Sequence, residues 1–174
     1  MVTNAESTFR IREVRPQEYA EAGGVVADAY REFIRPTDGA DWDEYLGELA
    51  DVAGRVGRTV VLVAVDADGK ILGSVTIEEE GVIGDDDASL EPGVSHIRML
   101  GVSPSARGRG VGRALMDACI ERARERGKRF VTLRTTDRML VAQRMYASMG
   151  FELDPEHDLV FDDGFRLIAY RLHL

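Results

Sequence analysis

The chain has 174 residues, of which 44% are hydrophobic and 30% charged, and its net charge at pH 7 is -9. This length suits one domain with a buried core better than two. The negative charge argues against a nucleic-acid partner, which would need basic contacts with phosphates, and no apolar run approaches the roughly 20 residues that cross a membrane.

The single cysteine and the first residues predict a cytoplasmic protein. Cys119 has no partner for an internal disulfide, which suits a reducing compartment. Residues 1–8 are polar and lack the basic start and apolar middle of a signal peptide. We therefore expect one domain over residues 1–174, without a membrane partner.

In the first half of the chain, the spacing of apolar residues predicts three strands and two helices. In chain order these are a strand at 9–14, a helix at 17–33, a helix capped by Asp41 that carries Trp42 to Leu49, and strands at 59–65 and 71–77. Gly23 and Gly24 predict a kink or break in the first helix. Residues 35–39 predict a turn before the second helix, and Asp68-Gly69 predicts a hairpin between the two strands.

In the second half, an acidic loop at 78–93 precedes alternating strands and helices. We expect, in order, a strand at 94–102, a helix at 110–126, a strand at 129–134, a helix at 138–149, and a final hairpin of 152–161 with 165–172. A right-handed crossover through the first of these helices would make the strands on either side of it parallel. The acidic loop is either a solvated connector or a surface that attracts a cationic amine.

The segment 103–113, which joins a strand to a helix, predicts an anion site. Its glycines are Gly108, Gly110 and Gly112, and its arginines are Arg107, Arg109 and Arg113. Glycines let the backbone approach a ligand closely, and the first N–H groups of a helix have no partner within it. Such a helix start attracts phosphate, and arginines add cationic donors.

Two common phosphate motifs do not fit this segment. A P-loop continues from its last glycine with Lys and Ser or Thr, whereas here Arg113 and Ala114 follow Gly112. In a dinucleotide fingerprint that starts at Gly108, the third glycine would fall on Arg113.

Two motifs in the second half of the chain resemble those of the GCN5-related N-acetyltransferase (GNAT) family. The first is a strand that ends in Leu-x-Val followed by Arg/Gln-x-x-Gly-x-Gly/Ala, matched here by Leu100, Val102, Arg107, Gly110 and Gly112. The second, A-x-x-x-Y-x-x-x-G-F, is matched by Ala142, Tyr146, Gly150 and Phe151. The resemblance extends over most of the chain.

This resemblance implies an α/β fold with a mixed, mostly antiparallel sheet of six or seven strands flanked by about four helices. The strands at 94–102 and 129–134 are expected to splay apart. Acetyl-CoA is the implied cosubstrate, with its pantetheine arm along the opened strand and its diphosphate on the glycine-rich segment. The expected cofactor-binding residues are Leu100, Gly101, Val102, Arg107, Gly108, Arg109, Gly110, Val111, Gly112 and Arg113.

The resemblance also suggests catalytic residues. Tyr146 occupies the family's general-acid position, although a tyrosine on the apolar face of a helix can also be core. His96 lies where some members carry a glutamate base, and an imidazole can accept a proton at neutral pH. A structural role for this histidine stays open, as do the rival bases Glu78 and Glu80 and a water.

One position departs from the family pattern. The family often has an asparagine seven residues before the tyrosine, and this chain has Met139 there. Thr135, Thr136 or Asp137 could supply the missing polar contact, or the contact could be absent.

We predict an N-acetyltransferase that moves an acetyl group directly from acetyl-CoA to a primary amine of a small molecule or of a peptide N-terminus. The alternative is a catalytically weak CoA-binding sensor or interaction domain. No metal is expected, because three scattered histidines and one cysteine give no ligand spacing. The resemblance allows a homodimer through an exposed last strand.

Overall fold

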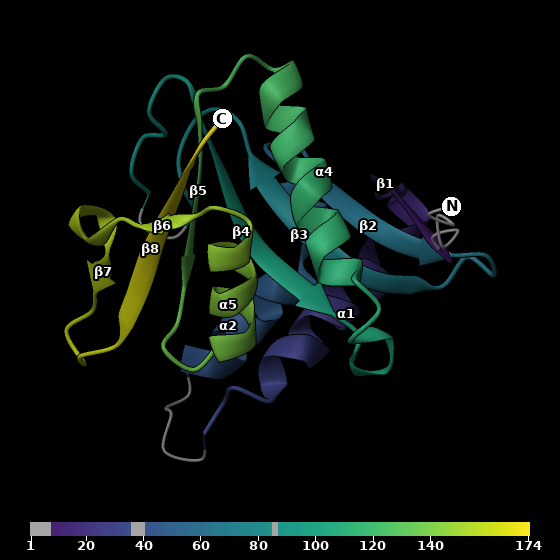
Figure 1. Ribbon diagram of the computed structural model, residues 1–174. Helices are drawn as coiled ribbons and strands as arrows, with labels where there is room; N and C mark the ends of the chain where they lie inside the picture. Colours follow the sequence, from purple (N-terminus) through teal and green to yellow (C-terminus); the bar gives the residue numbers. More distant parts are fainter. Residues whose placement is uncertain (1–7, 36–40, 85–86) are drawn as a thin grey trace.

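The computed structural model describes residues 8–35, 41–84 and 87–174, and these form a sheet of eight strands (Figure 1). The strand order is β1-β2-β3-β4-β5-β8-β6, with β7 also paired to β8. Neighbouring strands are antiparallel except for β4 and β5, which are parallel. The strands are β1 (Phe9–Glu13), β2 (Val60–Asp66), β3 (Ile71–Glu78), β4 (Val94–Val102), β5 (Phe130–Thr135), β6 (Glu152–Leu153), β7 (Leu159–Val160) and β8 (Arg166–His173).

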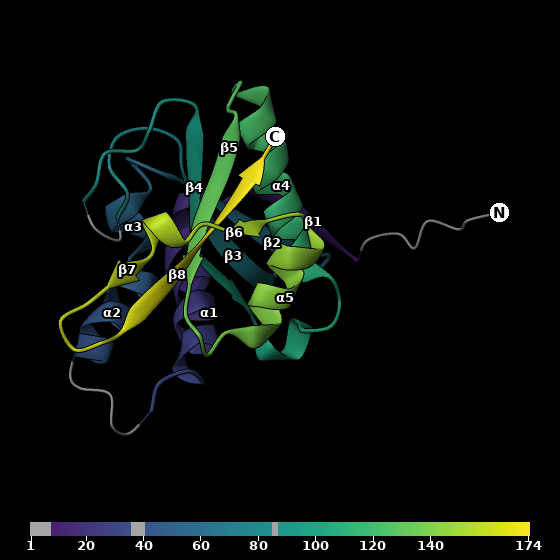
Figure 2. The ribbon, with the colours of Figure 1, turned by 60° about the vertical axis from the view of Figure 1, so that its left-hand side comes forward.

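Helices cover both faces of the sheet. Figure 2 shows α4 and α5 on one side of the strands and α1 and α2 on the other. The predicted mixed α/β fold is therefore confirmed. The helices are α1 (Tyr19–Arg31), α2 (Asp41–Ala50), α3 (Val52–Arg55), α4 (Val111–Glu125) and α5 (Leu140–Ser148), with 3-10 turns η1 (Pro16–Glu18), η2 (Pro104–Ala106) and η3 (Pro155–His157).

Strand β2 is apolar from Val60 to Val65 because both of its faces are covered. Leu62 and Ala64 belong to the core under α4, whereas Val61, Val63 and Val65 belong to the core under α1. Successive strand residues point to opposite faces, so a strand buried on both sides has no polar alternation. This explains the continuous apolar run that marks this strand in the sequence.

The prediction of a break in α1 was wrong, since the helix runs unbroken through Gly23 and Gly24. A Cβ built on Gly23 would lie 2.0 Å from the carbonyl oxygen of Ala50, at the end of α2. The glycine is therefore needed for helix packing. Asp41 was expected to precede α2 as its cap, but it is the first residue of that helix. The predicted turn at 35–39 lies largely outside the described residues.

The predicted strand at 152–161 is interrupted, which raises the number of strands to eight. Pro155 has no N–H to donate to a neighbouring strand, and the chain leaves the sheet there as η3. It returns as β7, where the Asp158 carboxylate accepts a hydrogen bond from the Ala169 N–H at 2.7 Å. The last strand, β8, is not an edge, because β5 pairs on one side and β6 and β7 on the other.

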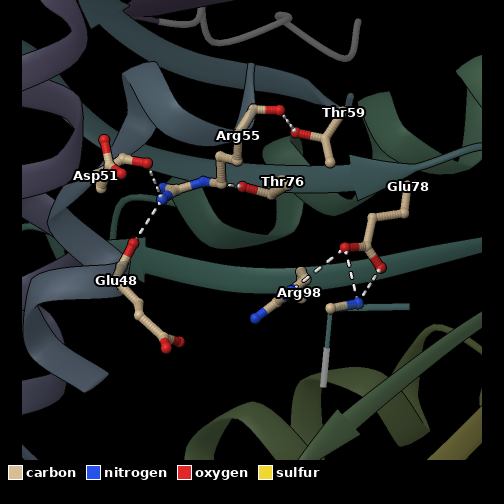
Figure 3. Close-up of polar contacts among 8 residues, drawn as sticks. Glu48, Asp51, Arg55, Thr59, Thr76, Glu78 and Arg98 are labelled. Atoms are coloured by element: carbon tan, nitrogen blue, oxygen red, sulfur yellow. Dashed lines mark hydrogen bonds and ion pairs between the residues drawn. The ribbon is translucent and has the colours of Figure 1, made fainter. Parts of the chain in front are cut away.

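A buried arginine fastens α2 to the sheet, and the sequence did not predict it. The Arg55 guanidinium donates to the carbonyls of Glu48 at 2.8 Å and Asp51 at 2.9 Å, and its Nε donates to the Thr76 hydroxyl at 3.2 Å (Figure 3). It also donates to the Leu49 carbonyl at 3.0 Å. Burial lowers the pKa of Arg55 to about 10, so it keeps its charge at neutral pH. It thereby satisfies the last carbonyls of α2.

Aromatic rings also connect the two halves of the sheet, from α1 beside β3 and β4 to the start of β8. Tyr30 of α1 contacts Tyr45 of α2 with 6.2 Å between ring centroids, and Tyr45 contacts Trp42 at 5.7 Å. Trp42 in turn contacts Phe165, just before β8, at 5.9 Å. All three pairs meet edge to face, the favoured geometry of aromatic rings.

Among the described residues, no helix has the length and apolar character needed to cross a membrane. The cytoplasmic location and the single-domain organisation stay predictions.

The pair of Arg12 and Glu18 gives a prediction for stability. Arg12 donates two hydrogen bonds to Glu18, at 2.8 and 2.6 Å, and these lower the pKa of Glu18 to about 2. A lowered pKa stabilises the fold above the ordinary value of 4.5, and this contribution is lost as the pH falls toward 2. We expect Glu18→Gln to lower the free energy of unfolding by about 1–2 kcal/mol at pH 7 and by much less at pH 2.

Urea unfolding at both pH values measures this difference. Glu44→Gln, at an exposed position of α2, is the matched control and should change the stability little at either pH. An equal loss for Glu18→Gln at pH 2 and pH 7 would show that the ion pair is not its cause.

Candidate functional site

The site begins where β4 and β5 separate. They pair over four residues each, from Val94 opposite Phe130 to Ile97 opposite Leu133. Beyond this point β5 stays with β8 through Thr135, and β4 stays with β3 through Val102. The predicted splay of these strands is therefore present.

A β-bulge helps to turn β4 away from β5. Met99 has a φ of 55°, and the register with β3 shifts between Ser74 and Thr76. An extra residue in one strand bends it and increases its twist. From Met99 to Val102, no strand of the described residues lies beside the edge of β4 that faces away from β3, so its backbone groups can pair with an extended ligand.

A cleft of about 630 Å³ occupies the gap between the strands. Its walls come from both faces of the sheet: α1 contributes from one side, and the glycine-rich segment and α5 from the other. Residues that line it include Tyr30, Phe33, Arg98, Leu100, Arg107, Gly110, Arg113, Arg134, Thr135, Arg138 and Tyr146.

The glycine-rich segment forms one end of the cleft. Gly108 and Gly110 have φ values of 73° and 79°, and Gly110 caps α4 without a side chain. The Ala114 N–H donates to the Gly110 carbonyl at 3.0 Å, so the three amides before it, at 111–113, precede the hydrogen-bonding ladder of the helix. This is the geometry that attracts a diphosphate.

The three arginines of this segment are in different surroundings. Arg107 makes a two-pronged ion pair with Glu32 at 2.8 Å, which ties the segment to the end of α1. Arg113 donates to the Ser148 hydroxyl at 3.1 Å and lines the cleft. Arg109 donates to the Thr8 hydroxyl at 3.0 Å and is not among the cleft-lining residues.

The predicted strand residues Leu100, Gly101 and Val102 all line the cleft. Gly101 has a further role, because a Cβ there would lie 2.8 Å from the Cα of Val26 in α1. The glycine lets α1 lie directly against β4. Val111 also lines the cleft, and it packs in the core beneath α4.

Tyr146 lines the cleft from α5 and is 6% exposed. Its ring contacts those of Phe151 and Tyr170, at centroid distances of 5.9 and 6.0 Å. Burial raises the pKa of its hydroxyl, which therefore stays protonated at neutral pH. None of the described residues hydrogen-bonds this hydroxyl, so it can donate to a ligand in the cleft.

Thr135 is the most suitable replacement for the asparagine that Met139 displaces. Both residues line the cleft, and the buried Thr135 hydroxyl has no hydrogen-bond partner among the described residues. Thr136 is equally buried but does not line the cleft, and Asp137 is exposed. A buried polar group without a partner is costly, and a ligand amide would relieve that cost.

The candidate bases lie on the α1 side of the sheet. His96 is 1% exposed, and its Nδ1 lies 2.9 Å from the Thr132 hydroxyl. It lines a second cavity of about 280 Å³, which shares Leu133 and Arg134 with the cleft. The structure therefore does not bring His96 and Tyr146 into one cavity.

Glu78 is the direct neighbour of His96, since the two residues are paired in register on β3 and β4. Its carboxylate accepts hydrogen bonds from the Gly84 N–H at 3.1 Å and from Arg98 at 3.3 Å (Figure 3). Glu80 is exposed beyond the end of β3. Neither glutamate lines the cleft or the second cavity.

The second cavity also contains charged pairs of the C-terminal hairpin. Burial alone would raise the pKa of Asp154, but hydrogen bonds from His157 and Arg171 bring it below its ordinary value. Among the described residues, no group of three or more His, Cys, Asp and Glu side chains could hold a metal ion. The absence of a metal stays a prediction.

Comparison with known proteins identifies the family. The model of the acetyltransferase (GNAT) family matches residues 25–151, which include the glycine-rich segment, the splayed strand and Tyr146. The chain belongs to this family. Membership confirms the resemblance and supports the predicted class of acyl-CoA-dependent N-acetyltransferases.

Solved structures of GNAT proteins agree with the fold. A GNAT acetyltransferase of Staphylococcus aureus Mu50 superposes with a TM-score of 0.71 at 19% identity, over 95% of this chain and 99% of the other. A GNAT acetyltransferase of Brucella melitensis, solved in complex with acetyl-CoA, has a TM-score of 0.60 at 28% identity over 84% of both chains.

A curated relative gives the sequence comparison. Mycothiol acetyltransferase of Cellulomonas flavigena is 40% identical over 87 residues, which is 49% of this chain and 25% of that protein. The matched segment thus covers about a quarter of the length of that relative.

Substitutions of Gly110 test the anion site. Asp and Asn tolerate a positive φ better than other residues, so Gly110→Asp should fold, while its carboxylate occupies the helix start and repels a diphosphate. We expect it to weaken acetyl-CoA binding at least about 100-fold in calorimetry, and Gly110→Asn, without the charge, to weaken it less.

Gly127→Asp is the matched control. Gly127 has a φ of 68° after the other end of α4, outside the cleft. This variant should bind acetyl-CoA as the wild type does. Unchanged affinity in Gly110→Asp would rule out this helix start as the anchor.

Proposed function

We propose that this protein is an N-acetyltransferase that moves the acetyl group of acetyl-CoA directly to a primary amine. The observation that carries the proposal is one cleft that combines three features: an open strand edge, a helix start with free amides, and a buried tyrosine hydroxyl. Each matches one part of acetyl-CoA, respectively the amide-bearing pantetheine arm, the diphosphate and the thioester sulfur.

The open edge of β4 supports a role in orienting the thioester. An extended arm that carries amides can pair with the backbone from Met99 to Val102 as an added strand does. The Thr135 hydroxyl, across the cleft on β5, offers a further polar contact. Fixing the thioester in this way would bring it into reacting distance of the amine and lower the entropic part of the barrier.

Tyr146 would act at the departing sulfur. As the thioester breaks, negative charge develops on the sulfur, and a neutral hydroxyl can donate a hydrogen bond or a proton to it. The raised pKa keeps this hydroxyl protonated throughout the neutral range. This placement also favours an active enzyme over a CoA-binding sensor, which would not need a donor there.

His96 is our preferred general base. Unlike Glu78 and Glu80, it lines one of the two cavities described above, and that cavity shares the lining residues Leu133 and Arg134 with the cleft. The amine must lose a proton when the new amide forms, and a neutral imidazole can accept it directly or through a water. Glu78, its neighbour in register, is engaged with Arg98 and Gly84.

The first test is thiol release from acetyl-CoA by the purified protein with a panel of primary amines. We expect Tyr146→Phe to fold and to bind acetyl-CoA normally, because the aromatic packing is kept. Its turnover should fall about 100-fold or more, in line with the loss of a general acid. Equal turnover in both proteins would remove Tyr146 from the mechanism.

Substitution of His96 tests the base. His96→Gln keeps a hydrogen-bonding side chain beside Thr132, so the fold should persist while the rate falls about 100-fold. The wild-type rate should decline on the acidic side of its pH profile, and this decline should be absent in the variant. Glu80→Gln is the control and should behave as the wild type. If Glu78→Gln alone removes the acidic decline, Glu78 is the base.

A further inference from the structure

The cleft contains one ion pair that a bound diphosphate would disturb. Among the described residues that line the cleft, Glu32 is the one acidic residue. Its carboxylate pairs with both terminal nitrogens of the Arg107 guanidinium, at 2.8 Å each. Because Arg107 belongs to the glycine-rich segment, an anionic side chain of the protein itself is paired with a cation of the anion site.

A ligand can open this pair. The side chains of Arg107 and Glu32 are 43% and 45% exposed. Ion pairs with this exposure contribute little to stability, because water screens both charges. A diphosphate at the start of α4 would offer Arg107 several anionic oxygens, and a guanidinium can bind such oxygens through two hydrogen bonds at once. Arg107 is thus engaged in the free protein and would have to change partners to contact the ligand.

The position of Glu32 makes this change of partners costly. Glu32 is the C-cap residue of α1, and the C-terminal end of a helix disfavours a negative charge. Arg31, the basic residue of the last turn of α1, pairs with Asp28. When Arg107 turns to the ligand, the Glu32 carboxylate would lie near both the helix end and the phosphates. Both effects oppose binding of the diphosphate.

The place of α1 does not depend on this ion pair. Arg138, just before α5, donates a hydrogen bond to the Phe33 carbonyl at 2.8 Å. Gly101 lets the middle of the helix lie directly against β4, since a Cβ there would lie 2.8 Å from the Cα of Val26. Arg107 can therefore exchange one partner for another by side-chain rotation, while the helix stays where it is.

We propose that Glu32 lowers the affinity for the cosubstrate by competing with its diphosphate for Arg107. This inference rests on the proposed binding of acetyl-CoA. Arg107 pairs with Glu32 in the free protein and binds the diphosphate in the complex. The product CoA carries the same diphosphate, so Glu32 also favours its release by taking Arg107 back.

Calorimetry of Glu32→Gln with acetyl-CoA and with CoA tests the sign of this effect. We expect the variant to bind both about 3- to 10-fold more tightly than the wild type, because the competing charge and its repulsion of the phosphates are gone. A merely structural tie between α1 and the glycine-rich segment would give the opposite result, since its loss would weaken binding. Equal or weaker binding by the variant would overturn the inference.

Asp28→Asn is the matched control. It removes one negative charge from α1, as Glu32→Gln removes one from the end of the same helix, but Asp28 pairs with Arg31 and does not line the cleft. This variant should bind acetyl-CoA as the wild type does. If it binds as tightly as Glu32→Gln, the charge of the helix and not the contact with Arg107 is responsible, and the inference is wrong.

Arg107→Gln tests the exchange itself. The single variant should bind acetyl-CoA about tenfold more weakly than the wild type, as expected for a lost charge-assisted contact. Without Arg107 there is no partner to exchange, so adding Glu32→Gln should restore less affinity than it gains when Arg107 is present. An equal gain in both backgrounds would mean that Glu32 only repels the ligand, which contradicts the exchange.

Pantetheine, the part of CoA without phosphates, gives an independent test. It offers no diphosphate to Arg107, which would stay with Glu32. Glu32→Gln should therefore bind pantetheine no better than the wild type does. An equal gain for pantetheine and for CoA would show that Glu32 acts on another part of the ligand, against the inference.

The outcomes separate the inference from the proposed function. Thiol release with acetyl-CoA and an amine, together with unchanged affinity in Glu32→Gln, would overturn the role of Glu32 and leave the acetyltransferase intact. Tighter binding by this variant without transfer to any amine would support the role of Glu32 and contradict the acetyl transfer. Failure of the wild type to bind acetyl-CoA would refute both.

Discussion

The site depends on the point at which β4 and β5 stop pairing, after Ile97 and Leu133. If the two strands stayed paired to their ends, the backbone from Met99 to Val102 would be occupied by β5 and no cleft could form. Because β4 stays paired with β3 and β5 stays paired with β8, the sheet remains intact on both sides of the opening. The opened edge and the cleft both follow from this short pairing.

Local features on β4 account for the separation. The bulge at Met99 bends the strand just past its last pair with β5, and Gly101 lets α1 lie against the bent part, so that the helix backs the edge that β5 has left. The start of α4 then lies beside the same edge, because η2 is the short connection between them. The anion site and the strand edge are thus fixed relative to one another by adjacent parts of the chain.

The sequence predicted those parts of the site whose chemistry is local. Positive φ values at Gly108 and Gly110, a helix start behind them, and the tyrosine before Gly150 and Phe151 all follow from short motifs. That Glu78 and His96 are direct neighbours could not be found in this way, since their relation depends on the register of two strands. The role of Gly23 could not be predicted for the same reason, because it depends on the contact with Ala50 of another helix and not on helix propensity.

The line of aromatic rings from Tyr30 through Tyr45 and Trp42 to Phe165 bears on the mechanics of the opened sheet. Within the sheet, the half that ends with β4 and the half that begins with β5 are joined by only four residue pairs. The aromatic rings form a second connection between the two halves. The middle two rings belong to α2, which Arg55 holds against β3. Two separate connections restrict rotation of one half of the sheet against the other more than one connection would. The protein itself therefore sets the width of the cleft before a ligand binds.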